Sequence, residues 1–262
     1  MRTNSGPVQS IDRVLDIVET LSEAPGGMAL SDLAAATGLH MSTTHRMLSA
    51  LADRGYACKD AATGRYRLTV RLFEIGSRVS ETTDLLSAAK PLLNGLTEEL
   101  QETSHLVEPD GCDVVYRYKV EPYRQMVRIS SCVGQRNPLY CTAVGKSILA
   151  QMPEEQVRGI WEKTDIRAYT DTTITDYAVF LKELEQIRRQ GYAFDNQEHD
   201  RGVRCVAAAV LNWEGKPAAA VSVSAPHFRM DEDAVRRIYP YLRETADALS
   251  RMMGYAGSAS AD

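Results

Sequence analysis

Apolar residues recur at helical spacing through the first quarter of the chain and predict three helices there. The first runs over Ile11–Leu21, where apolar side chains lie three and four positions apart. The second spans Ser31–Thr37 and the third Ser42–Arg54, with Gly38 and Gly55 suited to the left-handed residue that ends each helix. The apolar face of the third helix consists of Thr44, Met47, Leu48 and Leu51.

Two short segments of alternating polar and apolar residues follow the third helix. They are Tyr56–Lys59 and Arg65–Thr69, and the turn-forming residues between them end at Gly64. This arrangement is typical of a β-hairpin. Three helices followed by a hairpin predict a winged helix-turn-helix. A helical stretch at about Arg71–Ser87 comes next and is interpreted as a linker helix that leads to Pro91.

Beyond the linker, the pattern mixes helical and alternating periodicity. Helices are predicted over residues 92–100, 143–151, 154–163, 179–190 and 231–253. Strands are predicted over residues 104–107, 114–120, 126–129, 192–194, 203–211 and 218–224. The chain is therefore predicted to be α+β, with a winged helix-turn-helix domain over residues 1–78, a second domain over 79–254 and a disordered tail over 255–262.

Composition is consistent with two packed domains. The chain has 262 residues, 44% of them hydrophobic, which suffices for two cores. Its net charge is −5, so the molecule as a whole lacks the excess of positive charge that is typical of nucleic-acid-binding proteins. Between His40 and Arg78, however, seven Lys or Arg residues stand against three acidic residues. This local excess of +4 is what a DNA-binding surface requires, although runs of Arg also occur on plain solvated faces.

The sequence carries no signature of export, of a membrane span or of a bound metal. Its start, MRTNSGPVQSIDR, lacks the apolar core of a signal peptide. No stretch approaches the roughly 18 apolar residues of a transmembrane helix. The five cysteines are scattered without a CxxC pair, which indicates reduced thiols in a cytoplasmic protein. We expect neither a cofactor nor a metal.

The candidate DNA-binding residues lie at the start of the third helix and on the hairpin. In a helix-turn-helix, side chains near the start of the second helix of the motif contact base edges in the major groove. The predicted set is Ser42, Thr43, Thr44, His45 and Arg46 on the helix, with Lys59 and Arg65 on the hairpin near the DNA backbone. Thr44 also belongs to the apolar face of that helix. A small helical domain that binds protein is the alternative interpretation.

A second candidate site, for a small ligand, lies in the C-terminal half. Ser222 and Ser224 are two positions apart in a predicted strand and therefore point to the same face. Cys205 lies within an apolar strand, and small residues surround the predicted helix start at Ala143. Hydroxyls, a thiol and helix-start amides in an apolar wall suit a small carboxylate. A buried thiol is also often a plain core residue, and paired serines often bond only to local backbone.

Six stretches of the chain resemble the isocitrate lyase regulator (IclR) family of bacterial transcription factors. Three resemble its DNA-binding domain, namely VQSIDRVLDIVETL, SDLAAATGLHMSTTHRMLSALADRGY and TGRYRLTVRLFEIG. Three resemble its effector-binding domain, namely NPLYCTAVGKSILA, the segment from Thr173 to Val210, and AAAVSVSAP. They occur in the family's order from about Val8 to Met253, which is nearly the whole chain.

The resemblance implies a GAF-like effector domain, in which helices flank an antiparallel sheet. It implies a homodimer or a dimer of dimers on a palindromic double-stranded DNA operator. It also implies a regulator, most often a repressor, of a catabolic operon, with a small organic acid such as a keto acid, sugar acid or aromatic acid as effector. The positions that match the family's effector site are Met126, Asn137, Ala143, Val144, Asp195, Cys205, Ser222 and Ser224. Some relatives have a Gly-Ala pair in place of Ala143-Val144, so the particular ligand does not carry over.

Three other functions are weighed against this one. Asp195, His199 and Cys205 are residue types of a cysteine-dependent enzyme, but a thiol in a strand lacks the helix start that activates such nucleophiles. Cys141, His199 and Cys205 are residue types of a metal site, but HxxxH and CxxC spacings are absent. A DNA-binding protein that responds to no metabolite is the third alternative.

Overall fold

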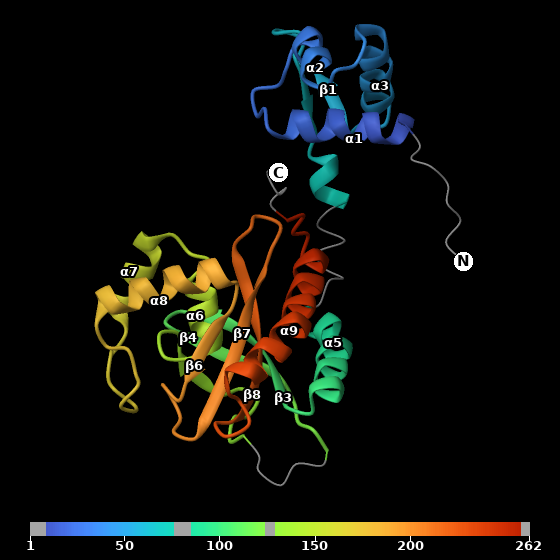
Figure 1. Cartoon of the computed structure of the whole chain (residues 1–262). Helices are drawn as coiled ribbons and strands as arrows, with labels where there is room; N and C mark the ends of the chain where they lie inside the picture. The colour runs from blue at the N-terminus through green and yellow to red at the C-terminus, as the bar shows by residue number, and fades with distance from the viewer. Residues whose placement is uncertain (1–8, 76–84, 124–128, 258–262) are drawn as a thin grey trace. The chain divides into compact units, whose positions relative to one another are not determined.

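Two compact units make up the chain, Met1–Thr82 and Thr83–Asp262 (Figure 1). The structure is a computed structural model, and it describes residues 9–75, 85–123 and 129–257. Separate clusters of buried apolar residues fill the N-terminal unit and the C-terminal unit. None of the helices in the described ranges combines the length and apolar composition that crossing a membrane requires.

The N-terminal unit is a winged helix-turn-helix, which confirms the prediction. Helices α1 (Gln9–Ser22), α2 (Leu30–Ala36) and α3 (Met41–Asp53) precede strands β1 (Ala57–Lys59) and β2 (Tyr66–Leu68), which pair as an antiparallel hairpin (Figure 1). Ile17, Leu33 and Leu48, one from each helix, are fully buried together in the core. Burial of each such side chain contributes about 1.5–3 kcal/mol to stability.

Glycines end the two helices of the motif, as predicted. Gly38 follows α2 with a φ of 65°, and Gly55 follows α3 with a φ of 79°. A side chain at either position would face a cost of about 1–2 kcal/mol in this left-handed region. The tight turn at Gly38 lets the amide of Leu39 donate to the carbonyl of Ala34 at 3.0 Å, and α3 begins two residues later.

The C-terminal unit is built on a six-stranded antiparallel sheet, which confirms the predicted α+β class. Its strand order is β5-β4-β3-β8-β7-β6. The strands are β3 (Thr103–Asp110), β4 (Asp113–Val120), β5 (Arg136–Pro138), β6 (Ala193–Asn196), β7 (Val203–Leu211) and β8 (Pro217–Pro226). Strands β3 and β8, which are far apart in sequence, pair in the middle of the sheet (Figure 1).

Helices cover both faces of this sheet (Figure 1). On one face lie α5 (Leu85–Leu100) and α9 (Glu232–Met252), and on the other lie α6 (Ala143–Leu149), α7 (Glu154–Lys163) and α8 (Tyr177–Gln190). In β8, Val221 and Val223 pack beneath α5 and α9. Because side chains alternate along a strand, Ser222 and Ser224 point to the face that α6 covers.

A β-bulge in β4 changes the face to which its side chains point. The register between β3 and β4 shifts between Leu106 and Val107, which leaves Arg117 of β4 without a register partner. Tyr116 therefore packs on the α6 side of the sheet, whereas Tyr118, two positions on, packs on the α5 side. The bulge is what directs the Tyr116 ring to the same side as the serines of β8.

The structure differs from the predicted pattern at two elements. Helix α5 begins at Leu85 and continues through Pro91, whereas the sequence predicts a helix that begins at Leu92. Proline removes one backbone donor, but Ala89 and Leu93 on either side of it are fully buried and hold the helix together by packing. Strand β5 was not predicted, because it has three residues and only its middle one is buried.

Several predicted segments extend beyond the described residues. The linker helix is helical over residues 71–75 and again from Leu85, while 76–84 lie outside the described ranges. The predicted strand over 126–129 falls mostly on residues 124–128, which also lie outside them, and Ile129 itself is in no strand. Within the tail, residues 255–257 form neither helix nor strand.

Candidate functional site

The DNA-binding residues predicted on α3 lie mostly at its exposed start. Ser42, His45 and Arg46 are exposed, and Thr43 is half-buried. The Nδ1 atom of His40, just before the helix, lies 3.1 Å from the Ser42 hydroxyl. Hydroxyl, imidazole and guanidinium groups at a solvent-facing helix start offer the donors and acceptors that base edges and phosphates require.

Thr44 does not belong to this surface, and its predicted role in DNA contact is wrong. Its side chain is 0% exposed. Its hydroxyl donates to the carbonyl of His40 at 3.3 Å, and the side chain packs with Met47 and Leu48 on the buried face of α3. Residues four apart lie above one another on a helix, so a residue one turn before the buried Leu48 faces the core as well.

Both hairpin residues of the predicted DNA-binding set are exposed, and hydrogen bonds hold the turn between them. Lys59 is exposed, as is Arg65, although one Arg65 nitrogen donates to the carbonyl of Gly27 at 2.9 Å. The Asp60 carboxylate accepts the backbone N–H of Thr63 at 2.8 Å. Hydrogen bonds from the backbone and hydroxyl of Thr63 lower the pKa of Asp60 below its ordinary value, because they stabilise the ionised carboxylate.

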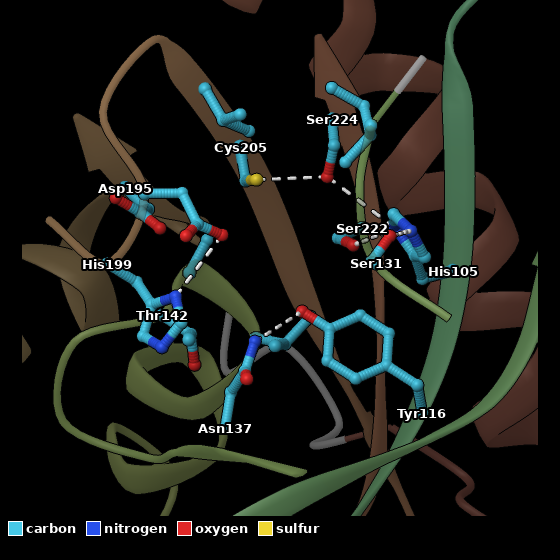
Figure 2. A pocket seen from close by; sticks show the side chains of 15 residues that line it. His105, Tyr116, Ser131, Asn137, Thr142, Asp195, His199, Cys205, Ser222 and Ser224 are labelled. Carbon is cyan, nitrogen blue, oxygen red and sulfur yellow. Dashed lines mark hydrogen bonds and ion pairs between the residues drawn. The ribbon is translucent and has the colours of Figure 1, made fainter. Parts of the chain in front are cut away.

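A polar cavity of about 30 Å³ lies in the C-terminal unit between the sheet and the start of α6 (Figure 2). This volume exceeds what one water molecule requires. Seven of the eight predicted effector residues line it, namely Asn137, Ala143, Val144, Asp195, Cys205, Ser222 and Ser224. The eighth, Met126, lies outside the described residues. Residues from five separate segments of the sequence thus meet at one cavity.

Strand register places the polar residues of the cavity in rows on one face of the sheet. Asp195 of β6 lies opposite Cys205 of β7, which lies opposite Ser224 of β8. In the neighbouring row, Ser222 of β8 lies opposite His105 of β3. Antiparallel partners on one face have their Cβ atoms about 4.5–5.5 Å apart, so these side chains are within hydrogen-bonding reach of one another.

A chain of hydrogen bonds connects His105 with Ser222 and Ser224, which we call the serine pair (Figure 2). The Nδ1 atom of His105 lies 3.3 Å from the Ser222 hydroxyl, and its Nε2 atom lies 2.8 Å from the Ser131 hydroxyl. The Ser224 hydroxyl lies 2.9 Å from the sulfur of Cys205 and 3.5 Å from His105 Nδ1. The imidazole therefore contacts both serines on one side and the loop before β5 on the other.

The start of α6 forms the wall that faces the sheet. The Thr142 hydroxyl caps this helix and accepts the backbone N–H of Gly145 at 3.1 Å. Ala143 and Val144 then line the cavity. A Cβ atom at Gly145 would lie 2.1 Å from the carbonyl oxygen of Leu139, so glycine is required for this close approach. The cap uses one of the helix-start amides that the sequence analysis assigned to an anion.

Tyr116 and Asn137 form a further side of the cavity. The Asn137 amide nitrogen lies 3.5 Å from the Tyr116 hydroxyl, and its carbonyl oxygen accepts from Gln135 at 3.0 Å. The Tyr116 ring meets the His105 ring edge-on, with 5.2 Å between the ring centres. Burial raises the pKa of Tyr116 above its ordinary value, so the phenol stays neutral and can both donate and accept.

Asp195 is a buried acid that titrates near neutral pH. It is 6% exposed, and its carboxyl oxygen accepts the backbone N–H of Glu198 at 2.6 Å. Burial, and then the charge of Glu198, raise the pKa of Asp195 to about 7, although the charges of Lys146 and His199 oppose this shift. A buried acid with such a pKa at the wall of a cavity is typical of a functional position.

The imidazole and the thiol of the cavity are neutral. Burial, reinforced by the charge of Lys119, lowers the pKa of His105 to about 3. Burial and the nearby Asp195 carboxylate raise the pKa of the Cys205 thiol above its ordinary value. A nucleophilic cysteine needs the opposite shift, toward thiolate. Cys205 is therefore suited to hydrogen bonding and not to covalent chemistry.

A buried ion pair fixes α6 to the loop that follows Asp195. The Lys146 ammonium contacts carboxylate oxygens of Glu183 at 2.8 Å and Glu198 at 2.5 Å, and it donates to the carbonyl of Phe194 at 2.7 Å. Burial alone would lower the pKa of Lys146, but the charges of Glu198 and Glu183 outweigh it and raise that pKa above its ordinary value. The lysine therefore stays charged and is fully occupied by these partners.

Eight further residues line the cavity. Thr142 belongs to the small-residue segment predicted at the start of α6, whereas the other seven were not predicted as effector contacts, namely His105, Tyr116, Ile129, Ser131, His199, Asp200 and Val203. Alternation along β3 was a usable signal for His105, because it shares a face with the buried Val107. Ile129 and Ser131 come from a loop, which has no periodic signal. His199 was considered only as a partner of Cys205 in an enzyme or metal site.

The rival metal site is not assembled. Across the described parts of the chain, no three His, Cys, Asp or Glu side chains are grouped so that they could hold a metal ion. Cys141 packs into the apolar core around α6, whereas His199 and Cys205 line the cavity.

Family models and curated relatives cover both units of the chain. The C-terminal domain of bacterial IclR transcriptional regulators matches residues 77–251, and the IclR helix-turn-helix domain matches residues 10–61. The DNA-binding transcriptional repressor YiaJ of Escherichia coli (strain K12) is 34% identical over 249 residues, which cover 94% of this chain and 88% of YiaJ. The HTH-type transcriptional regulator KdgR of the same organism is 33% identical over 248 residues, which cover 95% of this chain and 94% of KdgR.

Solved structures share the fold over nearly the whole chain. The crystal structure of Thermotoga maritima IclR has a TM-score of 0.64 at 30% identity and covers 95% of this chain and 100% of that one. The crystal structure of Pseudomonas aeruginosa HmgR has a TM-score of 0.70 at 28% identity and covers 96% of this chain and 100% of that one. With a helix-turn-helix unit and an effector-domain unit both matched, the chain belongs to the IclR family of DNA-binding transcriptional regulators, whose members are not enzymes.

Proposed function

We propose that this protein represses a catabolic operon and that a small carboxylate metabolite, bound in the cavity of the C-terminal unit, controls its affinity for the operator. The observation that carries the proposal is the convergence of seven family-matched effector positions on one polar cavity. The names of several relatives support repression, among them the transcriptional repressor IclR and the acetate operon repressor.

Operator binding is assigned to α3 and the β1–β2 hairpin. Ser42, His45 and Arg46 are exposed at the start of α3, and Lys59 and Arg65 are exposed on the hairpin. Short polar side chains and one arginine at a helix start suit base contacts in a major groove, and basic residues on a wing suit phosphates. A homodimer or a dimer of dimers, in the cytoplasm, would place two such helices on the half-sites of a palindromic operator.

The effector is assigned as a small carboxylic acid. The serine pair supplies two hydroxyls, while Asn137 and Tyr116 supply an amide and a phenol at another side. These groups can hydrogen-bond to the carboxylate and to the keto or hydroxyl oxygens of a keto acid or a sugar acid. Coupling between ligand and DNA sites is typically about 1–3 kcal/mol, so the effector should change operator affinity roughly five- to 150-fold.

Electrophoretic mobility shift at fixed salt tests this proposal. The full-length protein is titrated onto the promoter DNA that flanks its own gene, alone and with pyruvate, gluconate or benzoate as representatives of the three acid classes. Glucose, which lacks the carboxylate, is the matched control for gluconate. A specific shift that one acid alters supports the proposal. A specific shift that no acid alters would support a regulator that ignores small acids, and no specific shift would contradict the assignment of this operator.

A further inference from the structure

The direction of the hydrogen bonds at the serine pair decides whether this side of the cavity attracts or repels an anion. A serine hydroxyl has one proton and two lone pairs. If Ser222 donates its proton to His105, or Ser224 donates to Cys205, only lone pairs face the cavity, and they repel a carboxylate. If each serine instead accepts from its neighbour, its own proton is free to donate into the cavity.

We propose that His105 and Cys205 are positioning residues that each donate a hydrogen bond to one member of the serine pair, so that both serine protons point at the carboxylate of the effector. This inference rests on the proposed function, because it assumes an acid as ligand. It goes beyond that function by assigning a role to His105, and it fixes where the imidazole proton lies.

The charge distribution around His105 selects the tautomer that this arrangement requires. The neutral ring has one N–H, so one nitrogen donates while the other accepts. Lys119, the register partner of His105 in β4, donates to the carbonyls of Ile129 at 2.7 Å and Ser131 at 2.6 Å. Its positive charge thus lies on the Ser131 side of the ring, which is the side of Nε2. The positive charge of Lys119 stabilises a lone pair on Nε2 and disfavours an N–H there. The single proton of the neutral ring is therefore on Nδ1.

Glu121 does not cancel this field. Its carboxylate pairs with the Lys119 ammonium at 2.8 Å, but the Glu121 side chain is 33% exposed and that of Lys119 is 13% exposed. Water therefore screens the carboxylate more than the ammonium, and Lys119 remains the charge that His105 experiences most strongly. With the proton on Nδ1, the Ser131 hydroxyl donates to Nε2 and the Ser222 hydroxyl accepts from Nδ1.

Cys205 acts in the same way on Ser224. Burial keeps its sulfur protonated, so an S–H proton is available 2.9 Å from the Ser224 oxygen. Sulfur is a weak acceptor, whereas a hydrogen bond from a hydroxyl to a carboxylate is strong. The Ser224 hydroxyl therefore donates its hydrogen bond more favourably to the carboxylate of the ligand than to the sulfur of Cys205. The thiol in this position orients the hydroxyl and stays chemically inert.

Nitrogen-15 NMR of the full chain, labelled at histidine, tests the tautomer directly. The spectrum distinguishes a protonated ring nitrogen from an unprotonated one, so it shows which nitrogen carries the proton. The His105 signals are identified by their loss in His105→Asn and by their constancy between about pH 5 and about pH 8, because the His105 pKa is about 3. A proton on Nδ1 is the expected result. A proton on Nε2 would overturn the proposal for His105.

Matched variants test the effect on the ligand. His105→Asn keeps an N–H donor near the position of Nδ1, whereas His105→Leu fills similar space without one. Similarly, Cys205→Ser keeps a donor that Cys205→Ala removes. Affinity for pyruvate and gluconate should stay within about threefold in the donor-keeping variants and fall roughly tenfold in the others, as loss of a hydrogen bond to a charged group predicts.

Each outcome separates this inference from the proposed function. Thermal unfolding and operator binding without acid show whether each variant is folded. If the donor-keeping and the donor-removing variant of one residue are both folded and lose equal affinity for the acid, the residue only fills space, and the proposal is overturned. If the wild-type protein binds none of the acids, the proposed function fails, while the NMR spectrum still decides the tautomer of His105.

Discussion

Effector affinity should fall as pH rises through neutrality, because the cavity already contains an acid. A bound carboxylate would share the cavity with Asp195, and two like charges there repel. Lys146 does not offset the second charge, because Glu183 and Glu198 already pair with it. The groups that face Asp195 are Glu198, His199 and Asp200 after β6, Lys146 on α6, Cys141 before it, Cys205 on β7 and Tyr116 on β4. Binding of the anion is therefore expected to require protonated Asp195.

The size of this effect follows from the pKa of Asp195, which is about 7. About ten-elevenths of the molecules carry the proton at pH 6 and about one-eleventh at pH 8. The apparent dissociation constant is the intrinsic one divided by this fraction, so affinity should be roughly tenfold weaker at pH 8 than at pH 6. The effector's own carboxyl, with a pKa of about 4, stays ionised over this range.

Isothermal titration calorimetry at about pH 6, 7 and 8 measures this dependence. Repeating each titration in two buffers with different ionisation enthalpies counts the protons taken up, and uptake should approach about one per ligand at pH 8. Asp195→Asn is the matched control, since its amide cannot ionise and its affinity should not vary with pH. Constant affinity in the wild type, or the same pH dependence in Asp195→Asn, would exclude Asp195 as the group whose protonation controls binding.

Further variants separate the two units and test the buried acid. Arg46→Ala should weaken operator binding by about 1–3 kcal/mol and leave acid binding unchanged, and an unchanged operator shift would exclude Arg46 as a DNA contact. Ser222→Ala combined with Ser224→Ala should abolish the response to acid but keep operator binding in mobility shifts, so an intact response would remove the serine pair from the effector site. The pKa of Asp195 is raised from 3.8 to about 7, so the stability this group contributes is present below about pH 4 and lost as pH rises through 7. Asp195→Asn should therefore raise the free energy of unfolding at pH 8, by at most about 4 kcal/mol relative to wild type. Chemical unfolding at pH 4 and pH 8 measures this difference, and a variant that gains no more stability at pH 8 than at pH 4 would contradict the raised pKa.

Local sequence rules predicted the N-terminal unit well, because its elements depend on short-range interactions. The positions of Gly38 and Gly55 followed from helix ends alone, and both residues have positive φ. Thr44 was the error there. Its hydroxyl suggested a DNA contact, but the helical repeat that aligns it with Leu48 decides its orientation.

The cavity was only partly predictable, because strand pairing and a bulge assemble it. Ser222 and Ser224 share a face by simple alternation, Cys205 was a candidate from its place in an apolar strand, and the family resemblance supplied Asp195. Tyr116 reaches the cavity because β4 contains a bulge, and local sequence rules do not specify that register shift. Ser131 lies in a loop and becomes relevant only through its contact with His105.

The most direct test of the account is the operator affinity of wild-type protein and of the double variant Ser222→Ala, Ser224→Ala, each measured with and without gluconate or pyruvate at pH 6. One acid should change the wild-type affinity at least about fivefold and leave the affinity of the double variant unchanged. The same change in both proteins, or none in the wild type with either acid, would contradict control of DNA binding by a carboxylate in this cavity.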